Sequence, residues 1–140
     1  KHLDAIVCGS DQIWNPSHTG GQLDPAYFAH FGRPDLRRIS YAASLGGNCI
    51  DPAFVEQFKE YAGGMNLISL RETTGQVAAQ TLLATSQPLG KLRGHIHLFH
   101  GIPVIVTYHP AALLRNEAWK RPTWADVQLA QRVLEARTPR

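Results

Sequence analysis

The chain has 140 residues, of which 44% are hydrophobic and 18% are charged, values that are typical of a globular protein and exclude wholesale disorder. This length has room for one ordinary domain or for two incomplete ones. No apolar run approaches the roughly 20 residues that a transmembrane helix needs, so we expect no membrane partner. The chain begins at Lys1, without an initiator methionine or a signal-peptide hydrophobic region, and we expect it to start within a longer gene.

The net charge of +3 conceals an asymmetry between two halves. Residues 1–74 contain six Lys or Arg and eight Asp or Glu (net −2), whereas residues 75–140 contain eight and three (net +5). An acidic half joined to a basic half suggests different partners, and a basic half suits a polyanion. The alternative is a chance fluctuation in a short chain.

Three strands and a helix are predicted in the acidic half: strands at residues 3–8, 37–44 and 66–70, and a helix at residues 51–62. The first strand is expected to be buried and parallel, and to enter a loop at Gly9-Ser10-Asp11. Backbone N–H groups on such a loop suit a phosphate or a carboxylate.

The basic half continues the alternation of strands and helices. Its predicted elements are a helix from Thr73 or Thr74 to residue 83, a turn at residues 87–90, strands at residues 95–99 and 102–107, and an amphipathic helix from residue 123 or 124 to residue 137. We therefore predict an α/β fold with a parallel sheet, built as sandwich elements from two incomplete domains, residues 1–74 and 75–140. Ligands of such sheets bind at the carboxyl ends of strands, so chemistry is expected at residues 107–115.

Four ordered motifs in the basic half carry a family resemblance: GQVAAQTLL (residues 75–83), GKLRG (90–94), TYHPAALLR (107–115) and WADVQLA (124–130). Together they resemble the C-terminal half of the family 4, iron–sulfur type, uracil-DNA glycosylases. That family acts in base-excision DNA repair and removes uracil by N-glycosidic cleavage. The implied partner is uracil-containing DNA, single- or double-stranded.

The resemblance implies a role for most residues of the third motif. His109 would be the catalytic donor to a uracil carbonyl, where charge accumulates as the base leaves, and a neutral imidazole suffices for this. Leu113, with Leu114 beside it, would wedge into the duplex when the base flips out. Ala111 stands where many relatives have Ser, which would remove one hydroxyl contact to phosphate. Phosphate contacts are implied for the turn residues and the start of the short helix: Lys91, Arg93, Pro110, Ala111 and Arg115.

Three motifs in the acidic half resemble a different family: DAIVCGSDQIWNP (residues 4–16), ISYAASLG (39–46) and ISLRE (68–72). They are similar to a central part of the first domain of the polysaccharide pyruvyl transferases. That family implies a two-domain, glycosyltransferase-type fold that moves a pyruvyl ketal from phosphoenolpyruvate onto a sugar polymer. The corresponding phosphate or substrate loop would contain Gly9, Ser10, Asp11, Ser44 and Gly46.

The basic half lacks parts that the glycosylase family needs. Family members carry an acidic residue that positions the attacking water, an aromatic residue and an Asn that read uracil, and four cysteines that hold a [4Fe–4S] cluster. Cys8 and Cys49 are too few for that cluster, so we expect no cofactor and no glycosylase activity. We expect both thiols to be buried in a cytoplasmic protein. His95, His97 and His100 have no carboxylate or thiol nearby in sequence, so we expect surface imidazoles and no metal site.

Three hypotheses about function therefore remain open. The basic half could derive from a DNA-repair glycosylase and retain DNA contacts without catalysis. The acidic half could represent the true family, which would make the chain a sugar-modifying transferase. The chain could also be a non-functional composite, formed by a truncated gene fusion or an assembly join.

Overall fold

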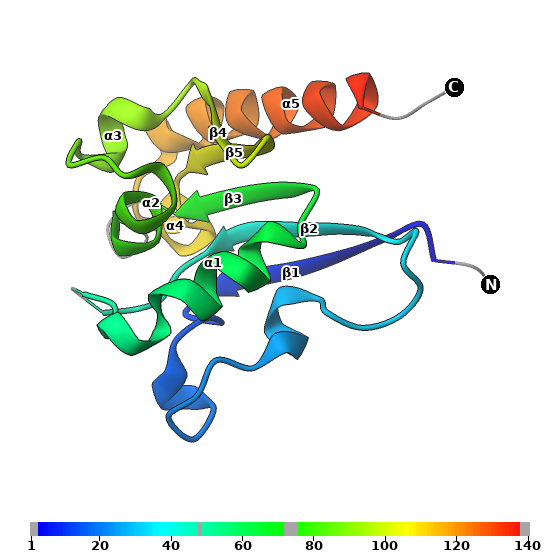
Figure 1. Ribbon diagram of the computed structural model, residues 1–140. Coiled ribbons are helices and arrows are strands. Elements are labelled where there is room, and N and C mark those ends of the chain that lie inside the picture. The colour runs from blue at the N-terminus through cyan, green and yellow to red at the C-terminus, as the bar shows by residue number, and fades with distance from the viewer. Residues whose placement is uncertain (1–2, 48, 72–75, 138–140) are drawn as a thin grey trace.

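A five-stranded, mostly parallel sheet lies at the centre of the computed structural model, which describes residues 3–47, 49–71 and 76–137 (Figure 1). The strand order is β1-β2-β3-β5-β4. Strands β1, β2, β3 and β5 run parallel, and β4 pairs antiparallel with β5. The strands are β1 (Ala5–Asp11), β2 (Arg37–Ala43), β3 (Leu67–Arg71), β4 (Ile96–Phe99) and β5 (Ile102–Thr107).

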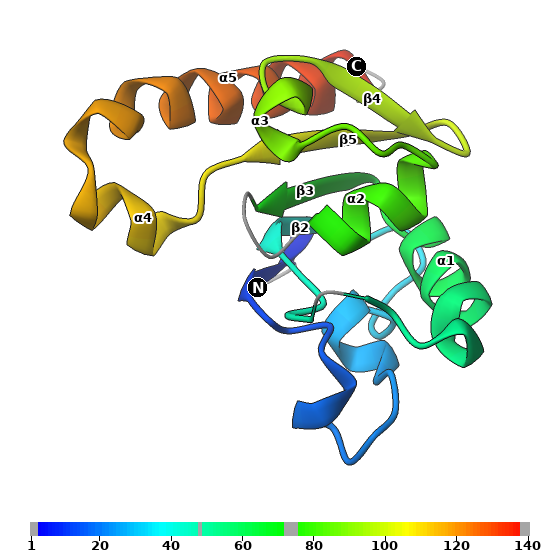
Figure 2. The same cartoon turned by 90° about the vertical axis from the view of Figure 1, so that its left-hand side faces the viewer.

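Helices cover the two faces of the sheet unequally (Figure 2). Helices α1, α2 and α3 pack on one face, α5 packs on the other beside β5, and α4 connects β5 to α5. The helices are α1 (Val55–Gly63), α2 (Gln76–Leu83), α3 (Leu89–Leu92), α4 (Pro110–Arg115) and α5 (Lys120–Ala136). Short 3-10 turns are η1 (Pro16–His18), η2 (Pro25–Phe28), η3 (Pro52–Phe54) and η4 (Glu117–Trp119). Each turn follows an Asn or Asp whose side chain accepts a hydrogen bond from the backbone two residues later.

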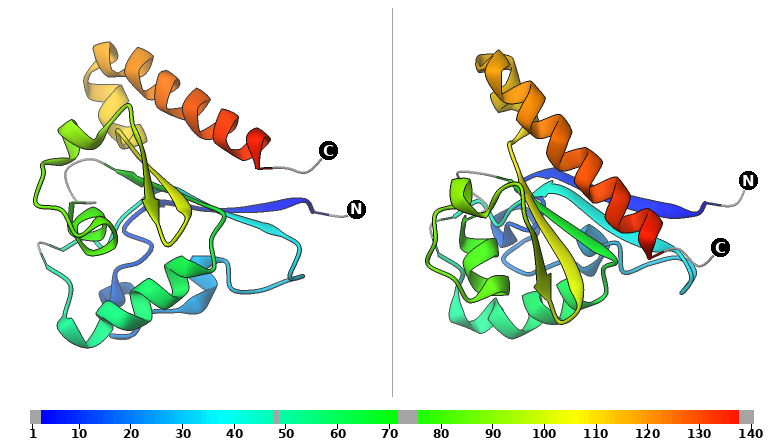
Figure 3. Two further views of the ribbon diagram at one scale, coloured as in Figure 1. Left: turned by 45° about the horizontal axis from the view of Figure 1, so that its top comes forward. Right: turned by 90° about the horizontal axis from the view of Figure 1, so that it is seen from above.

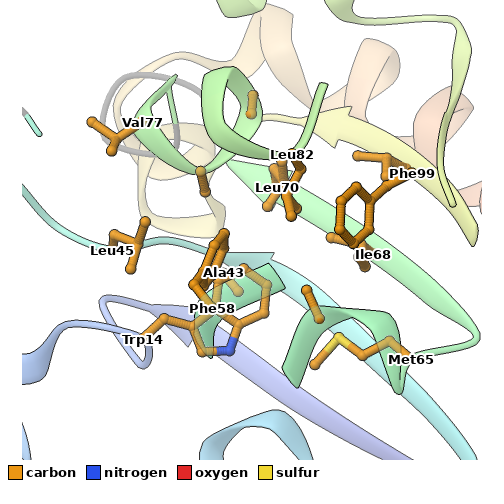
Figure 4. Close-up of a cluster of buried hydrophobic side chains, with 14 of the residues drawn as sticks. Trp14, Ala43, Leu45, Phe58, Met65, Ile68, Leu70, Val77, Leu82 and Phe99 are labelled. Carbon is orange, nitrogen blue, oxygen red and sulfur yellow. The ribbon is translucent and has the colours of Figure 1, made fainter. Parts of the chain in front are cut away.

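The main core lies between the sheet and helices α1 to α3 (Figure 4). Trp14 stacks on Phe28 with ring centroids 5.1 Å apart, and Phe58 meets both rings edge-on. The indole N–H of Trp14 donates to the carbonyl of Tyr27 at 3.0 Å, so the polar atom of this buried ring is satisfied. Val104 of β5 belongs to the same cluster. Both halves of the sequence therefore contribute to one core.

The opposite face of the sheet is only partly covered. Figure 3 shows α5 running obliquely across one end of the sheet, and a cavity of about 140 Å³ lies between them. Apolar side chains such as Ile39, Leu67 and Val127 line this cavity. On the edge strand β1, Val7 is 61% exposed. This face is consequently apolar and open toward β1.

The structure confirms the predicted α/β fold with a mostly parallel sheet. It also joins the two halves in one sheet, because β3 pairs with β5 in a register that runs from Ile68↔Val104 to Arg71↔Thr107. The origin of the halves in two families stays a prediction. The predicted helix start at Thr73 or Thr74 and the boundary between residues 74 and 75 lie outside the described residues.

Four details differ from the sequence-based predictions. Strand β1 is an exposed edge strand rather than a buried one, and it extends through Gly9, Ser10 and Asp11 instead of ending before them. Cys49 is exposed, so the prediction of two buried thiols is wrong for it, whereas Cys8 is partly buried and its burial raises its pKa to about 11. Helix α3 occupies part of the predicted turn at 87–90, and α5 begins three residues early.

In the described part of the chain, no helix combines the length and hydropathy needed to cross a membrane.

Candidate functional site

The carboxyl ends of the parallel strands bring polar residues from both halves of the chain to one edge of the sheet. Asp11 ends β1, Arg71 ends β3 and Thr107 ends β5. Ser44 follows β2 directly, and His109 follows β5 by two residues. Parallel strands all end at the same edge, so topology alone gathers these side chains where α/β proteins bind ligands.

An ion pair connects β1 to β3 across this edge. Arg71 Nη1 donates to Asp11 Oδ1 at 2.6 Å, and the Arg71 side chain is only 7% exposed while that of Asp11 is 67% exposed. The backbone N–H and the hydroxyl of Ser44 donate to the carbonyl oxygen of Asp11 at 2.9 and 3.3 Å. Asp11 therefore anchors the end of the edge strand to both β2 and β3.

The ring of His109 is oriented by the backbone of α4. Nδ1 accepts a hydrogen bond from the N–H of Ala111 at 3.1 Å, which makes His109 the N-cap residue of this helix. Because an accepting Nδ1 carries no proton, the proton of the neutral ring is on Nε2. Burial lowers the pKa of His109, and the positive charges of Arg71 and Arg115 lower it further, against an opposing effect of Asp11. The site therefore favours a neutral imidazole with an Nε2–H donor.

Three buried polar atoms at this edge have no hydrogen-bond partner: Arg71 Nε, Thr107 Oγ1 and His109 Nε2. Arg71 is 6% exposed and Thr107 is 1% exposed. Buried polar groups in native structures are nearly always satisfied, and each exception calls for an explanation such as a ligand or water. Among residues 3–47, 49–71 and 76–137, these three are the buried side-chain nitrogen and oxygen atoms that have no hydrogen-bond partner.

Helix α4, which His109 caps, carries the other residues of the third motif to which the glycosylase resemblance assigns a role. Leu114 is 85% exposed, Arg115 is exposed and Leu113 is partly buried. Pro110 starts the helix, and the N–H of Ala111 is already bonded to His109. One short helix thus carries an exposed leucine and an exposed arginine and is capped by a neutral imidazole, a set of side chains that suits contact with a nucleic acid base and backbone.

The two basic residues near α3 have different environments. Lys91 is exposed, whereas the guanidinium of Arg93 is 3.8 Å from the ring centroid of Tyr108 and forms a buried ion pair with Asp126 of α5. Arg93 Nε donates to Asp126 Oδ2 at 3.1 Å, and Tyr108 stacks on Trp119 with centroids 4.6 Å apart. Arg93 thus attaches α5 to the end of β5, and a phosphate would have to compete with Asp126 for it.

The glycines of the predicted loop in the acidic half are favoured for different reasons. A Cβ at Gly9 would overlap the backbone carbonyl of Tyr41 on β2, whereas Gly46 is favoured by its backbone φ of +78°, since the Gln12 side chain that a Cβ would meet there can move. Ser10 lies within β1. Asp11 and Gln12, with neighbours from η1 and η2, line an open pocket of about 420 Å³. A phosphate or substrate role for Gly9, Ser10, Asp11, Ser44 and Gly46 stays a prediction.

The residues of this chain do not fit the [4Fe–4S] cluster of the glycosylase family. A cluster of this kind takes four thiolates, and the sequence has two cysteines, of which Cys49 is exposed and Cys8 lies on β1. Within the described ranges, no group of three or more His, Cys, Asp or Glu side chains is placed to hold a metal ion. His97, one of the three histidines considered above for a metal site, forms a hydrogen bond through Nε2 with the carbonyl oxygen of Leu92 at 2.8 Å.

A comparison with protein-family models found none that matches this chain. The two family resemblances therefore rest on the sequence motifs. Of the site residues, the sequence indicated His109, Asp11 and Ser44, but not Arg71 or Thr107. In the sequence, both residues are polar residues at the end of an apolar strand. This pattern indicates a binding site only when the strand order is known, because the order determines which strand ends are neighbours.

Proposed function

We propose that residues 75–140 give this protein a uracil-DNA glycosylase-like function, limited to contact with single-stranded or uracil-containing DNA and without efficient base excision. The observation that carries the proposal is the neutral His109, whose buried Nε2 has no hydrogen-bond partner among the described residues and which caps the helix that carries exposed Leu114 and Arg115. We place this function in the cytoplasm.

Each residue of this surface would contribute a different interaction. His109 Nε2–H would donate to a base carbonyl oxygen, Leu113 with exposed Leu114 beside it would contact a base face, and Arg115 and Lys91 would neutralise phosphates. The net charge of +5 on residues 75–140 favours approach of a polyanion. Excision itself needs an activated water, and the sequence lacks the family's water-positioning motif.

Salt-dependent binding to a single-stranded, uracil-containing oligonucleotide tests the proposal. Fluorescence anisotropy should show binding that weakens as salt rises, and Arg115→Ala should lower the slope of log K against log salt by about 0.7, the value for one lost contact to a single strand. Lys59→Ala is the matched control, because Lys59 lies on α1, away from α4, and pairs with Glu56. Its slope should equal that of the wild type.

Four other results would each change the conclusion. Binding that is absent or insensitive to salt would contradict DNA contact. Release of free uracil that His109→Ala abolishes would show a complete glycosylase. Binding of phosphoenolpyruvate without DNA binding would favour the pyruvyl-transferase alternative, whose Ser44 hydroxyl is currently bonded to Asp11. Failure of both ligands to bind would favour the non-functional composite.

A further inference from the structure

We propose that the edge of the sheet between β3 and β5 is a binding site for a small oxyanion, a carboxylate or phosphate group, which accepts hydrogen bonds from Arg71, Thr107 and His109. The three atoms that would donate are the three buried side-chain polar atoms that have no partner in the part of the chain that the structure describes. Neither sequence half contains this site alone, since Arg71 belongs to one and the other two residues to the other.

The backbone places these donors on one side of the sheet. Arg71 and Thr107 are register partners on adjacent parallel strands, and such partners project their side chains to the same face. His109 lies two residues beyond Thr107 in extended conformation. Burial lowers the pKa of the His109 ring most, and the positive charge of Arg71 lowers it next, in keeping with the placement of both residues at this edge.

The chemistry of the donors matches an oxyanion. Asp11 Oδ1 bonds to Nη1 of Arg71, which leaves the Nε edge of the same guanidinium for a second acceptor. Carboxylates and phosphates bind such an edge with high geometric specificity. Thr107 adds a hydroxyl donor. His109 adds an Nε2–H donor, because its Nδ1 accepts from the N–H of Ala111 and the ring proton is therefore on Nε2.

Asp11 opposes a bound anion, but its side chain is 67% exposed, so it can turn toward solvent. Asp126 lines a cavity together with Thr107, and its charge is compensated by the ion pair with Arg93.

An empty site of this kind is costly for the fold, and this gives a sharp first test. Thr107→Val keeps the shape of the side chain and removes a buried hydroxyl that has no partner. Without added anion we expect this variant to melt about 3–5 °C higher than the wild type. An unchanged or lower melting temperature would show that the hydroxyl is satisfied, which would contradict the site.

Anion binding by the full chain is the second test, with inorganic phosphate and acetate as separate probes and chloride at equal ionic strength as reference. We expect one or both probes to raise the melting temperature of the wild type and to bind in calorimetry. Thr107→Val and Arg71→Lys, which keeps the charge but removes Nε, should each weaken binding at least about tenfold. A response to phosphate alone assigns a phosphate site, and a response to acetate alone assigns a carboxylate site.

Arg38→Lys is the matched control, because Arg38 is also a partly buried arginine held by hydrogen bonds but lies near the start of β2, at the opposite end of the strand from the proposed site, where it donates to the carbonyls of Ala29 and Leu36. Its anion affinity should equal that of the wild type. Equal stabilisation of all variants would indicate general exclusion of the salt from the protein surface and would contradict the site. No nucleic acid is present in these measurements, so their outcome is independent of the proposed DNA contact.

Discussion

At the scale of single residues, His109 shows how one backbone bond can determine the chemistry of a side chain. The N–H of Ala111 occupies Nδ1, so the only ring nitrogen that can face a ligand is Nε2. The ring as a whole is partly exposed, yet its Nε2 atom is enclosed and unpartnered. Burial and then the charges of Arg71 and Arg115 lower the pKa of this ring and so oppose a second proton, against the opposite effect of Asp11. His109 is therefore built as a hydrogen-bond donor and not as a cation.

We predict that His109 titrates below its ordinary pKa of 6.5 and that its neutral form carries the proton on Nε2. Because the unfolded chain binds this proton more readily than the folded one, the contribution to stability is complete above pH 6.5 and is lost as the pH falls toward the lowered pKa. Nitrogen-15 NMR of the imidazole ring would report both the tautomer and the titration. A titration at or above 6.5, or an Nδ1–H tautomer, would contradict the geometry described here.

His109→Asn is the matched variant for the stability measurement. Asn is a favourable N-cap residue, so this substitution keeps an acceptor for the N–H of Ala111 and removes the titrating group. The difference in unfolding free energy between wild type and variant should decrease between pH 7 and pH 5. A difference that stays constant over this range would mean that His109 does not link folding to pH.

The sequence assigned roles to residues where a motif carried the information, and those roles stay predictions. His109 and Arg115 stand in a nonapeptide with a recognisable spacing, and Asp11 stands at the end of an apolar run. Arg71 and Thr107 also stand in the motifs ISLRE and TYHPAALLR, but neither motif gave them a role, because their proximity arises from a register between strands whose paired residues are 36 positions apart along the chain. Arg93 is the opposite case: a motif assigned it a phosphate contact, but in the structure its guanidinium pairs with Asp126, a partner 33 residues away that the local sequence does not reveal.

At the scale of elements, strand β1 has an exposed edge and an exposed apolar face. The sequence predicted a buried strand because residues 5–8 are mainly apolar, but strand order places β1 outside β2, where no further strand pairs with it in the described chain. Val7 is consequently 61% exposed, and Leu98 on the other edge strand is 64% exposed. Unprotected edges of this kind favour pairing with another chain.

We predict that Val7→Lys reduces self-association without loss of stability, because a lysine on an edge strand disfavours pairing between chains. The unfolding free energy should change by no more than about 0.5 kcal/mol, since the side chain is mostly exposed. Light scattering and size-exclusion chromatography across a concentration series would measure association. Gln128→Lys, an exposed position on α5, adds the same charge elsewhere and should leave association unchanged. An equal effect of both variants would attribute solubility to net charge rather than to the edge.

At the scale of the whole molecule, the two halves of the sequence share one sheet and one core. The β3–β5 pairing joins them through four register pairs, and the main hydrophobic cluster combines Trp14, Phe28 and Phe58 with Phe99 and Val104. The sequence predicted the element types on both sides of residue 74 but not this connection, because the hydrophobic pattern of a strand does not name its neighbour. A physical unit can therefore form whether or not the halves share an evolutionary origin.

This shared core predicts a single cooperative unfolding transition for the full chain. In a urea titration followed by two-dimensional NMR, amide signals from β1 to β3 should disappear at the same urea concentration as those from β4, β5 and α5. Phe58→Leu, which shortens a fully buried ring in the acidic half, should destabilise both sets of signals equally, by about 1–2 kcal/mol. Since Phe58 contacts the core that both halves form, its loss cannot be confined to one of them. Two separate midpoints, or a shift restricted to β1, β2 and β3, would show that residues 1–74 and 75–140 fold as independent units.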